Sequence, residues 1–130
     1  MNEIVSEWIS KAERDFETAE RESLVGVNAN FDAICYHYQQ CIEKLMKGII
    51  VGLGENPPKT HNLEVLSRII ATHVPNWHAS ANDLRLLTHA ASDFRYPGET
   101  ASQSIADRSS EVAKYYRTAL LEQIKLIDEL

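Results

Sequence analysis

The stretch from Phe31 to Gly54, FDAICYHYQQCIEKLMKGIIVGLG, decides the fold of this chain. Its apolar residues return every three or four positions, which is the period of an amphipathic helix. Asn30 precedes the stretch as an N-cap, Asp32 places a negative charge in the first turn, and Gly54 is a natural C-terminal stop. The stretch therefore predicts one long helix with a broad buried stripe.

Polar side chains that a core does not require lie along one flank of this helix. They are three or four residues apart, so they share a face: His37, Gln40, Lys44 and Lys47. An apolar stripe bordered by Gln, Lys and His is where we first look for a functional surface. Lys44 and Lys47 are placed to reach a shared anion.

The rest of the chain predicts four more helices, separated by short breakers that contain Pro, Gly and Asn. We expect them at 3–23, from about 63 to 73, from near 80 to about 94, and from about 102 to 129. No alternating β pattern and no internal repeat interrupts them. The fold class that follows is all-α: an up-and-down antiparallel helical bundle with three long and two short helices. The residues expected to face the core are Ile4, Trp8, Ala12, Phe16 and Ala19; Leu63, Leu66 or Val65, Ile69 and Ile70; Leu84, Leu87, Ala91 and Phe94; and Ile105, Val112, Tyr115 or Tyr116, Ala119, Leu120, Gln123 and Ile127.

Length and charge limit the classes of protein to consider. A chain of 130 residues is expected to form a single domain, 1–130, with a core of its own. The net charge of −6 argues against broad electrostatic coating of nucleic acid. No apolar run is long enough to span a membrane and the start of the chain lacks signal-peptide features, so we expect a cytoplasmic protein. Cys35 and Cys41 are expected to be small core residues, without a disulfide between them.

The common catalytic and metal-binding motifs are missing from the sequence. There is no Glu-x-x-His pair, no His-Glu-x-x-His and no Cys-x-x-Cys, which predicts neither a metal nor a cofactor. There is also no glycine-rich phosphate loop and no Gly-x-Ser-x-Gly turn.

Residues suited to an anion lie near the ends of the predicted helices. His61 and Arg95 each follow or precede a proline-fixed backbone, and the guanidinium is a rigid fork that suits phosphate or carboxylate. Tyr96 offers a ring that can stack on a base or on a neighbouring ring. With Lys44 and Lys47 from the long helix, these residues form the predicted ligand set.

Each of these residues also has a structural interpretation. Glu43 and Lys47 form a helical (i, i+4) pair that decorates a surface. His61 hydrogen-bonds at the start of the next helix. Arg95 pairs with an acid two residues before it or four residues after it. Asp15 is either exposed at the boundary of its stripe or makes a deliberate polar contact.

Residues in four blocks resemble the HEPN domain, in the order and spacing of that family. The resemblance covers nearly the whole chain and implies an up-and-down bundle of four or five helices, commonly a homodimer. Members are often encoded beside a minimal nucleotidyltransferase and act with it, many as toxin–antitoxin pairs. The blocks are Trp8-x-x-x-Ala12-x-x-Asp15-x-x-x-Ala19, Tyr36-x-x-Gln39-Gln40-x-x-Glu43-Lys44-x-x-Lys47, Thr60-His61-Asn62-Leu63 and Arg95-Tyr96-Pro97.

Some HEPN domains are metal-independent ribonucleases with an Arg-x(4–6)-His motif, and others bind nucleotides, RNA or protein partners without catalysis. Arg95 stands at the place of the motif's arginine, but residues 100–102 are Thr, Ala and Ser where the histidine is expected. The literal Arg-x(4)-His from Arg68 to His73 lies inside a short helix, where five residues turn through about 500°. We interpret that match as chance, and no catalytic residue is predicted.

Three hypotheses follow. The first is a HEPN-domain module that binds a nucleotide or an RNA phosphate through the predicted ligand set, forms a homodimer and acts with a minimal nucleotidyltransferase in a toxin–antitoxin-like system. The second is a metal-independent RNA endonuclease that uses Arg95 with His61 or His37. The third is an interaction module whose helical faces form a dimer. The acidic charge favours the first and third, because RNA cleavage benefits from a basic track.

Overall fold

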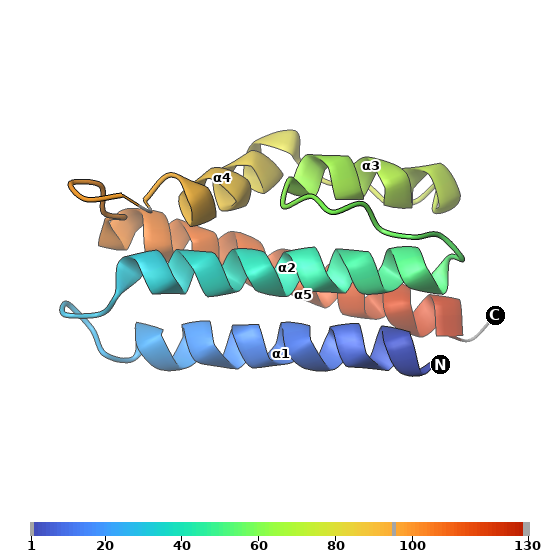
Figure 1. The fold of residues 1–130 in the computed structure, drawn as a ribbon, viewed down its shortest axis with the longest axis horizontal. Coiled ribbons are helices and arrows are strands. Elements are labelled where there is room, and N and C mark those ends of the chain that lie inside the picture. Colours follow the sequence, from blue (N-terminus) through green and yellow to red (C-terminus); the bar gives the residue numbers. More distant parts are fainter. Residues whose placement is uncertain (1, 95, 129–130) are drawn as a thin grey trace.

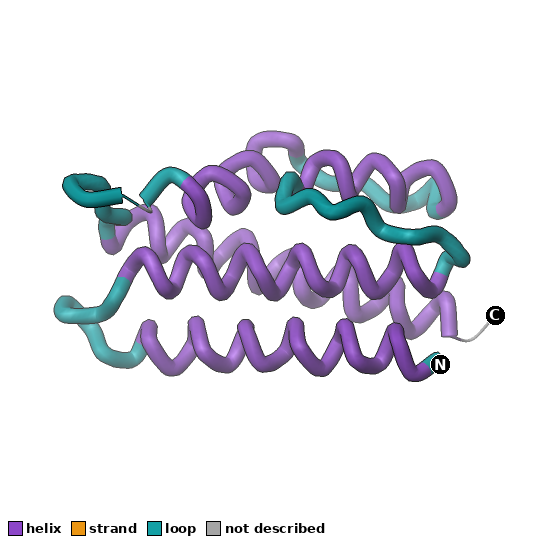
Figure 2. Tube along the Cα trace, viewed as in Figure 1, coloured by secondary structure: helices purple, strands orange, loops and turns teal. Residues whose placement is uncertain are grey.

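The computed structural model of this chain describes residues 2–94 and 96–128. These residues form helices and no strand: α1 (Glu3–Ser23), α2 (Phe31–Gly52), α3 (Leu63–His73), α4 (Ala81–Ser92) and α5 (Gln103–Asp128). In Figure 1, α1 and α2 run antiparallel side by side, α5 lies behind α2, and α3 and α4 lie in line along the top. Figure 2 shows the connection 53–62 folding back along α2. The predicted all-α bundle of three long and two short helices is confirmed.

The central element is α2, which packs against each of the other four helices. Among the described residues, the α1 backbone closely approaches only α2. Because other helices surround α2, its apolar stripe is broad and its large side chains are almost completely buried. They are Tyr38, Ile42, Leu45, Met46, Ile49 and Ile50.

Close contact between α1 and α2 depends on a glycine. A Cβ built on Gly48 would lie 3.1 Å from the Cβ of Trp8, which is tighter than ordinary van der Waals contact. The hydrogen atom at this position therefore lets the two helices approach each other. Because the Trp8 Cβ is bonded to the backbone, a larger residue would force α1 to shift by a few tenths of an ångström.

Side chains cap the helices largely where the sequence indicates. Asn30 accepts a hydrogen bond from the backbone N–H of Ala33, and Asn62 rather than Thr60 caps α3. Gly54 has a φ of +90°, and the next residue donates its N–H to the carbonyl of Ile50. This is the left-handed glycine ending that the sequence predicts.

Some details of the predicted core are corrected. Ile4 is 58% exposed and Val5 is buried instead, because Val5, Ala12 and Ala19 recur every seven residues on the side that faces α2. For α5 the sequence left Tyr115 or Tyr116 as the core residue. In the structure Tyr116 is buried and Tyr115 is exposed. The α4 helix ends at Ser92, about two residues earlier than expected.

Both cysteines lie in the core as free thiols: Cys35 and Cys41 are completely buried. Burial raises the pKa of the Cys41 thiol to about 12, so it stays protonated. No described helix is both long and apolar enough to cross a membrane.

Candidate functional site

The polar flank of α2 is divided between two carboxylates. Asp15 reaches it from α1 and contacts His37 and Lys44, and we call these three residues the Asp15 cluster. Glu43, from α2 itself, is the centre of the second group. This Glu43 cluster consists of Glu43 with Gln39, Gln40, Lys47 and His61.

The Asp15 cluster joins α1 to α2. Lys44 Nζ donates to Asp15 Oδ2 at 2.5 Å, and His37 Nδ1 donates to Asp15 Oδ1 at 2.8 Å. Asp15 is buried, whereas the side chains of Lys44 and His37 remain 25% and 29% exposed. Of the two interpretations left open for Asp15, the structure shows the polar contact. Because the carboxylate holds Nδ1, the other ring nitrogen of His37 is left for a further partner.

The Glu43 cluster is more enclosed. Glu43 is only 3% exposed, and its Oε1 accepts from Gln39, Gln40 and His61 while its Oε2 accepts from Lys47 Nζ at 3.1 Å. Gln39 also donates to the backbone carbonyl of His61 at 2.9 Å, which fixes the connection 53–62 against α2. The (i, i+4) pair of Glu43 and Lys47 therefore exists, in the interior rather than on the surface.

These contacts set the charge of Glu43. Burial by itself raises the pKa of a carboxyl group, but the hydrogen bonds from His61, Gln39 and Lys47 and the charge of Lys47 outweigh it. The pKa of Glu43 is accordingly held below its usual value. Glu43 is thus an anion at neutral pH, although water hardly reaches it.

Beside the Asp15 cluster, a shallow cleft of about 310 Å³ lies between the first turns of α2 and the last turn of α4. Tyr36 and His37 pack edge to face, with ring centroids 5.3 Å apart. Phe94 lines the opposite wall, just after the end of α4. Aromatic walls with a few polar groups are typical of small-ligand sites. The lining residues are Asn30, Asp32, Ala33, Tyr36, His37, Ala90, Ala91 and Phe94.

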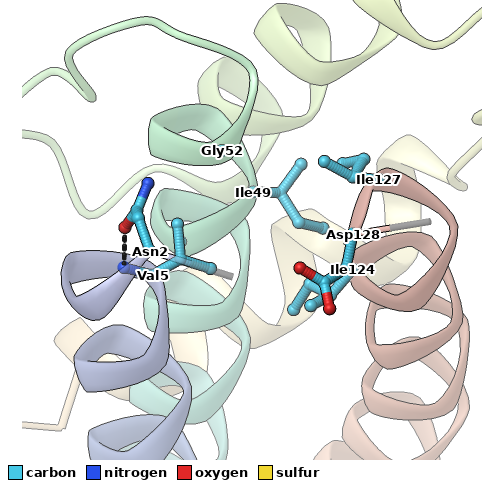
Figure 3. A pocket seen from close by; sticks show the side chains of 8 residues that line it. Asn2, Val5, Ile49, Gly52, Ile124, Ile127 and Asp128 are labelled. Atoms are coloured by element: carbon cyan, nitrogen blue, oxygen red, sulfur yellow. Dashed lines mark hydrogen bonds between the residues drawn. The ribbon is translucent and has the colours of Figure 1, made fainter. Parts of the chain in front are cut away.

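A second hollow, of about 150 Å³, lies at the opposite end of the bundle, where the beginning of α1 meets the ends of α2 and α5 (Figure 3). Its walls are mainly the aliphatic side chains of Val5, Ile49, Ile124 and Ile127. The Asn2 side chain at its edge is used to cap α1 through the N–H of Val5. The Asp128 carboxylate also lines this hollow, but no aromatic ring does, whereas rings line two walls of the α2–α4 cleft. The cleft is therefore the stronger candidate site for a ligand with a ring.

The predicted ligand set is spread over these features. Lys44 belongs to the Asp15 cluster, whereas Lys47 and His61 both contact Glu43, and the imidazole of His61 is 76% exposed. Tyr96 is 70% exposed in the loop after α4. Arg95 lies outside the described residues. The two lysines are each paired with a different carboxylate of the chain.

Comparison with models of protein families identifies the family. The model of the HEPN domain matches residues 5–124 of this sequence, which is nearly the whole chain. This chain belongs to the HEPN family. No protein with a curated description matches its sequence.

Two solved structures share the HEPN fold of this chain. The crystal structure of TT1696 from Thermus thermophilus has a TM-score of 0.72 and 15% identity, over 92% of this chain and 97% of that one. The crystal structure of ST0689, described as an archaeal HEPN homologue, has a TM-score of 0.68 and 24% identity, over 95% of this chain and 99% of that one. At these identities the likeness establishes the fold.

In this HEPN domain, a residue at the expected position of the ribonuclease histidine makes a structural contact. Ala101, one of the residues that stand where the histidine is expected, is buried, and its backbone N–H donates to Asp32 Oδ1 at 2.6 Å. The loop before α5 is thus tied to the first turn of α2. The Arg-x(4)-His match at Arg68 and His73 does not form a joint site, because the two side chains have different partners. Arg68 donates to the carbonyl of Glu64, and His73 contacts Glu55.

Sequence reasoning missed part of the cleft. The sequence places Phe94 in the core and gives Asp32 only the role of a favourable charge in the first turn, yet both line the cleft. The available signal is the (i, i+4) spacing of Asp32 and Tyr36, which puts a carboxylate and a ring on one side of a helix outside the apolar stripe. Across the described residues, no group of His, Cys, Asp or Glu is arranged to hold a metal ion.

Proposed function

We propose that this HEPN domain binds a nucleotide, either free or within single-stranded RNA, with the base in the α2–α4 cleft and the phosphate at its rim. The observation that carries this proposal is the cleft itself: rings on two walls, with an imidazole held in place by a buried carboxylate at its edge. Base stacking on an aromatic side chain contributes about 1–3 kcal/mol per base.

The rim supplies groups for the phosphate. His37 lines the cleft, and Lys44 follows it about two turns later on α2. Both contact Asp15, and each keeps part of its side chain in solvent. A protonated imidazole bound to Asp15 through Nδ1 donates its second N–H outward. Arg95 directly follows Phe94, a wall of the cleft, and keeps its expected role as the phosphate fork. With a net charge of −6, binding depends on these local groups rather than on long-range attraction.

Thermal unfolding in the presence of nucleotides tests this proposal. A ligand at 100 times its Kd adds about 2.7 kcal/mol, which raises the unfolding temperature of a domain of this size by several degrees. We expect Tyr36→Ala and Arg95→Ala to abolish the shift. Matched controls are Tyr115→Ala on α5 and Arg14→Ala on α1, two exposed residues that should leave the shift unchanged. An unchanged shift in Tyr36→Ala would remove the cleft from the proposal.

The homodimer and the minimal nucleotidyltransferase partner, in a toxin–antitoxin-like system, form the wider part of this proposal. Light scattering on the purified chain measures the first, and co-purification with a nucleotidyltransferase encoded next to it measures the second. A monomer at all concentrations would contradict the homodimer. A nucleotidyltransferase that does not co-purify would contradict the partnership.

Metal-independent cleavage of RNA is the second candidate function, favoured by the two carboxylate–imidazole pairs, Asp15–His37 and Glu43–His61. Attack of a 2′-hydroxyl on the adjacent phosphate needs a base for the hydroxyl proton and an acid for the leaving 5′-oxygen. We would measure cleavage of a short RNA in the presence of a chelator. Cleavage that persists in both His37→Ala and Arg95→Ala would exclude this use of the site.

A further inference from the structure

We infer that the α2–α4 cleft selects guanine, and that Asp32 is the residue that reads the base. This inference rests on the proposed function, because it names the ligand of the same cleft. Asp32 and Tyr36 are four residues apart on α2, so they project from the same side of the helix, and both line the cleft. A base stacked on the Tyr36 ring therefore has its edge near the Asp32 carboxylate.

The Asp32 carboxylate is fixed but only partly used. Its Oδ1 accepts the backbone N–H of Ala101 at 2.6 Å, which ties the carboxylate to the loop before α5. Among the described residues, its Oδ2 has neither a hydrogen bond nor an ion pair. A half-buried carboxylate oxygen held in one orientation is a preorganised acceptor, so a ligand loses little additional freedom when it binds there.

A neighbouring residue complements this acceptor with a donor. Asn30 also lines the cleft, and its side-chain Oδ1 is occupied by the N–H of Ala33 at 3.0 Å. This contact assigns the amide orientation and leaves the NH₂ group of Asn30 for a ligand. The edge of the cleft therefore presents one amide donor and one carboxylate acceptor within the first residues of α2.

Guanine matches this arrangement among the common bases. Its Watson–Crick edge carries the O6 acceptor followed by two adjacent donors, N1–H and the N2 amino group. One donor pairs with Oδ2 of Asp32 and the other with the second lone pair of its Oδ1, which the N–H of Ala101 leaves open, and O6 accepts from the amide of Asn30. Adenine and cytosine each place a ring-nitrogen lone pair beside their single amino group, which would face the Asp32 anion. Uracil has one N–H between two carbonyl oxygens, so it also presents an acceptor to the carboxylate.

The expected consequence is selectivity more than tight binding. A carboxylate adds negative charge near a phosphate, so Asp32 lowers the affinity for every nucleotide that does not pair with it. A ligand that does not pair with Asp32 leaves a half-buried carboxylate oxygen without a donor, which adds to the rejection of that ligand. We therefore expect GMP to bind at least tenfold more tightly than AMP. IMP, which has N1–H and O6 but lacks the amino group, should lie between them.

Calorimetric titration of the whole chain with GMP, IMP and AMP tests the inference. In Asp32→Asn the side-chain oxygen still accepts the N–H of Ala101, while an NH₂ group replaces the free Oδ2. This variant should keep its fold, measured by circular dichroism, and lose the preference for GMP. Asp93→Asn, at the end of α4 and outside the cleft lining, is the charge-matched control and should keep the preference.

The source of the guanine is decided by adding two RNA oligomers, a hexamer of uridine and the same hexamer with one central guanosine. Binding of the second oligomer that is tighter than that of both GMP and the uridine hexamer places the guanine in RNA. Binding of GMP that is tighter than that of either oligomer identifies a free nucleotide, and both results support selection of guanine. Equal binding of the two oligomers, tighter than that of GMP, would contradict it. Equal binding of GMP, IMP and AMP that Tyr36→Ala still abolishes overturns the inference and leaves the proposed function intact. No binding of any nucleotide or oligomer overturns the proposed function, and the inference with it.

Discussion

The carboxylates of Asp15 and Glu43, along the polar flank of α2, have the same kinds of partner but differ in how far solvent reaches them. Asp15 and Glu43 each bind one lysine and one histidine. Glu43 is 3% exposed and accepts four hydrogen bonds, whereas Asp15 accepts two, from side chains that solvent still reaches. A carboxylate with a lysine and a histidine therefore fixes a connection against α2 in the Glu43 cluster, whereas in the Asp15 cluster it lies at the edge of a cleft.

What differs is the element that closes over each cluster. The connection 53–62 lies along α2, and Gln39 fixes it through the carbonyl of His61, so the Glu43 cluster is covered. Near the Asp15 cluster the neighbouring wall is the end of α4, which leaves a cleft. Enclosure raises the cost of leaving a charge unpaired, and openness leaves hydrogen-bonding capacity for a ligand.

The largest effect on stability is expected for Glu43→Gln. The substitution removes the negative charge beside Lys47, whose ammonium is almost buried, and an uncompensated buried charge costs about 3–5 kcal/mol. Urea unfolding at neutral pH measures the loss. Glu111→Gln, at an exposed (i, i+3) pair with Arg108, is the matched control and should change the free energy of unfolding by less than about 0.5 kcal/mol. Equal losses in the two variants would mean that the enclosure of Glu43 is unimportant.

The sequence predicted much of the helical framework, because helix ends and apolar periodicity are local properties. Asn30 as a cap, Gly54 as a stop and the inward face of α2 follow from residues close together in the chain. The prediction for Ile4 is wrong because the first turn of a helix offers two candidate stripes, and only the position of α2 selects Val5.

The site was less predictable, because its contacts cross between helices. The spacing of Lys44 and Lys47 correctly puts both on one flank, and the sequence indicates an anion for them. It does not indicate that Asp15, separated from Lys44 by 29 residues, takes one of them. The cleft depends on where α4 ends beside α2, which no local pattern determines.

A smaller loss is expected for Asp15→Asn. The asparagine keeps one acceptor oxygen but no longer carries a charge opposite Lys44 and His37, and both partners can turn to water. Loss of hydrogen bonds to a charged group in this setting costs about 1–2 kcal/mol. Urea unfolding is again the measurement, with Glu17→Gln on the exposed side of α1 as the control. A loss as large as that of Glu43→Gln would break the distinction between the two clusters.

Glu43 should also make the stability depend on pH, with a smaller change than either substitution at neutral pH. The pKa of Glu43 is lowered in the folded state, so its contribution to stability is fully present above the unfolded value of about 4.5. That contribution is lost as the pH falls from there through the folded pKa. We expect the urea midpoint of the wild type to fall more steeply below pH 4.5 than that of Glu43→Gln. Parallel curves for the two proteins would contradict the lowered pKa.

The smallest effects on stability, and the clearest separation of function from structure, are expected for the two histidines. His61→Ala removes one of four hydrogen bonds to a buried carboxylate and should cost about 1 kcal/mol, with nucleotide affinity unchanged. His37→Ala removes one of the two hydrogen bonds to Asp15 and should cost a similar amount, but it should weaken nucleotide binding about tenfold, because His37 lines the cleft and Asp15 orients it. Both variants are measured by urea unfolding and by titration with the same nucleotide. If His61→Ala lost affinity and His37→Ala did not, the ligand would lie at the Glu43 cluster, and the exposed imidazole of His61 rather than the α2–α4 cleft would be its contact.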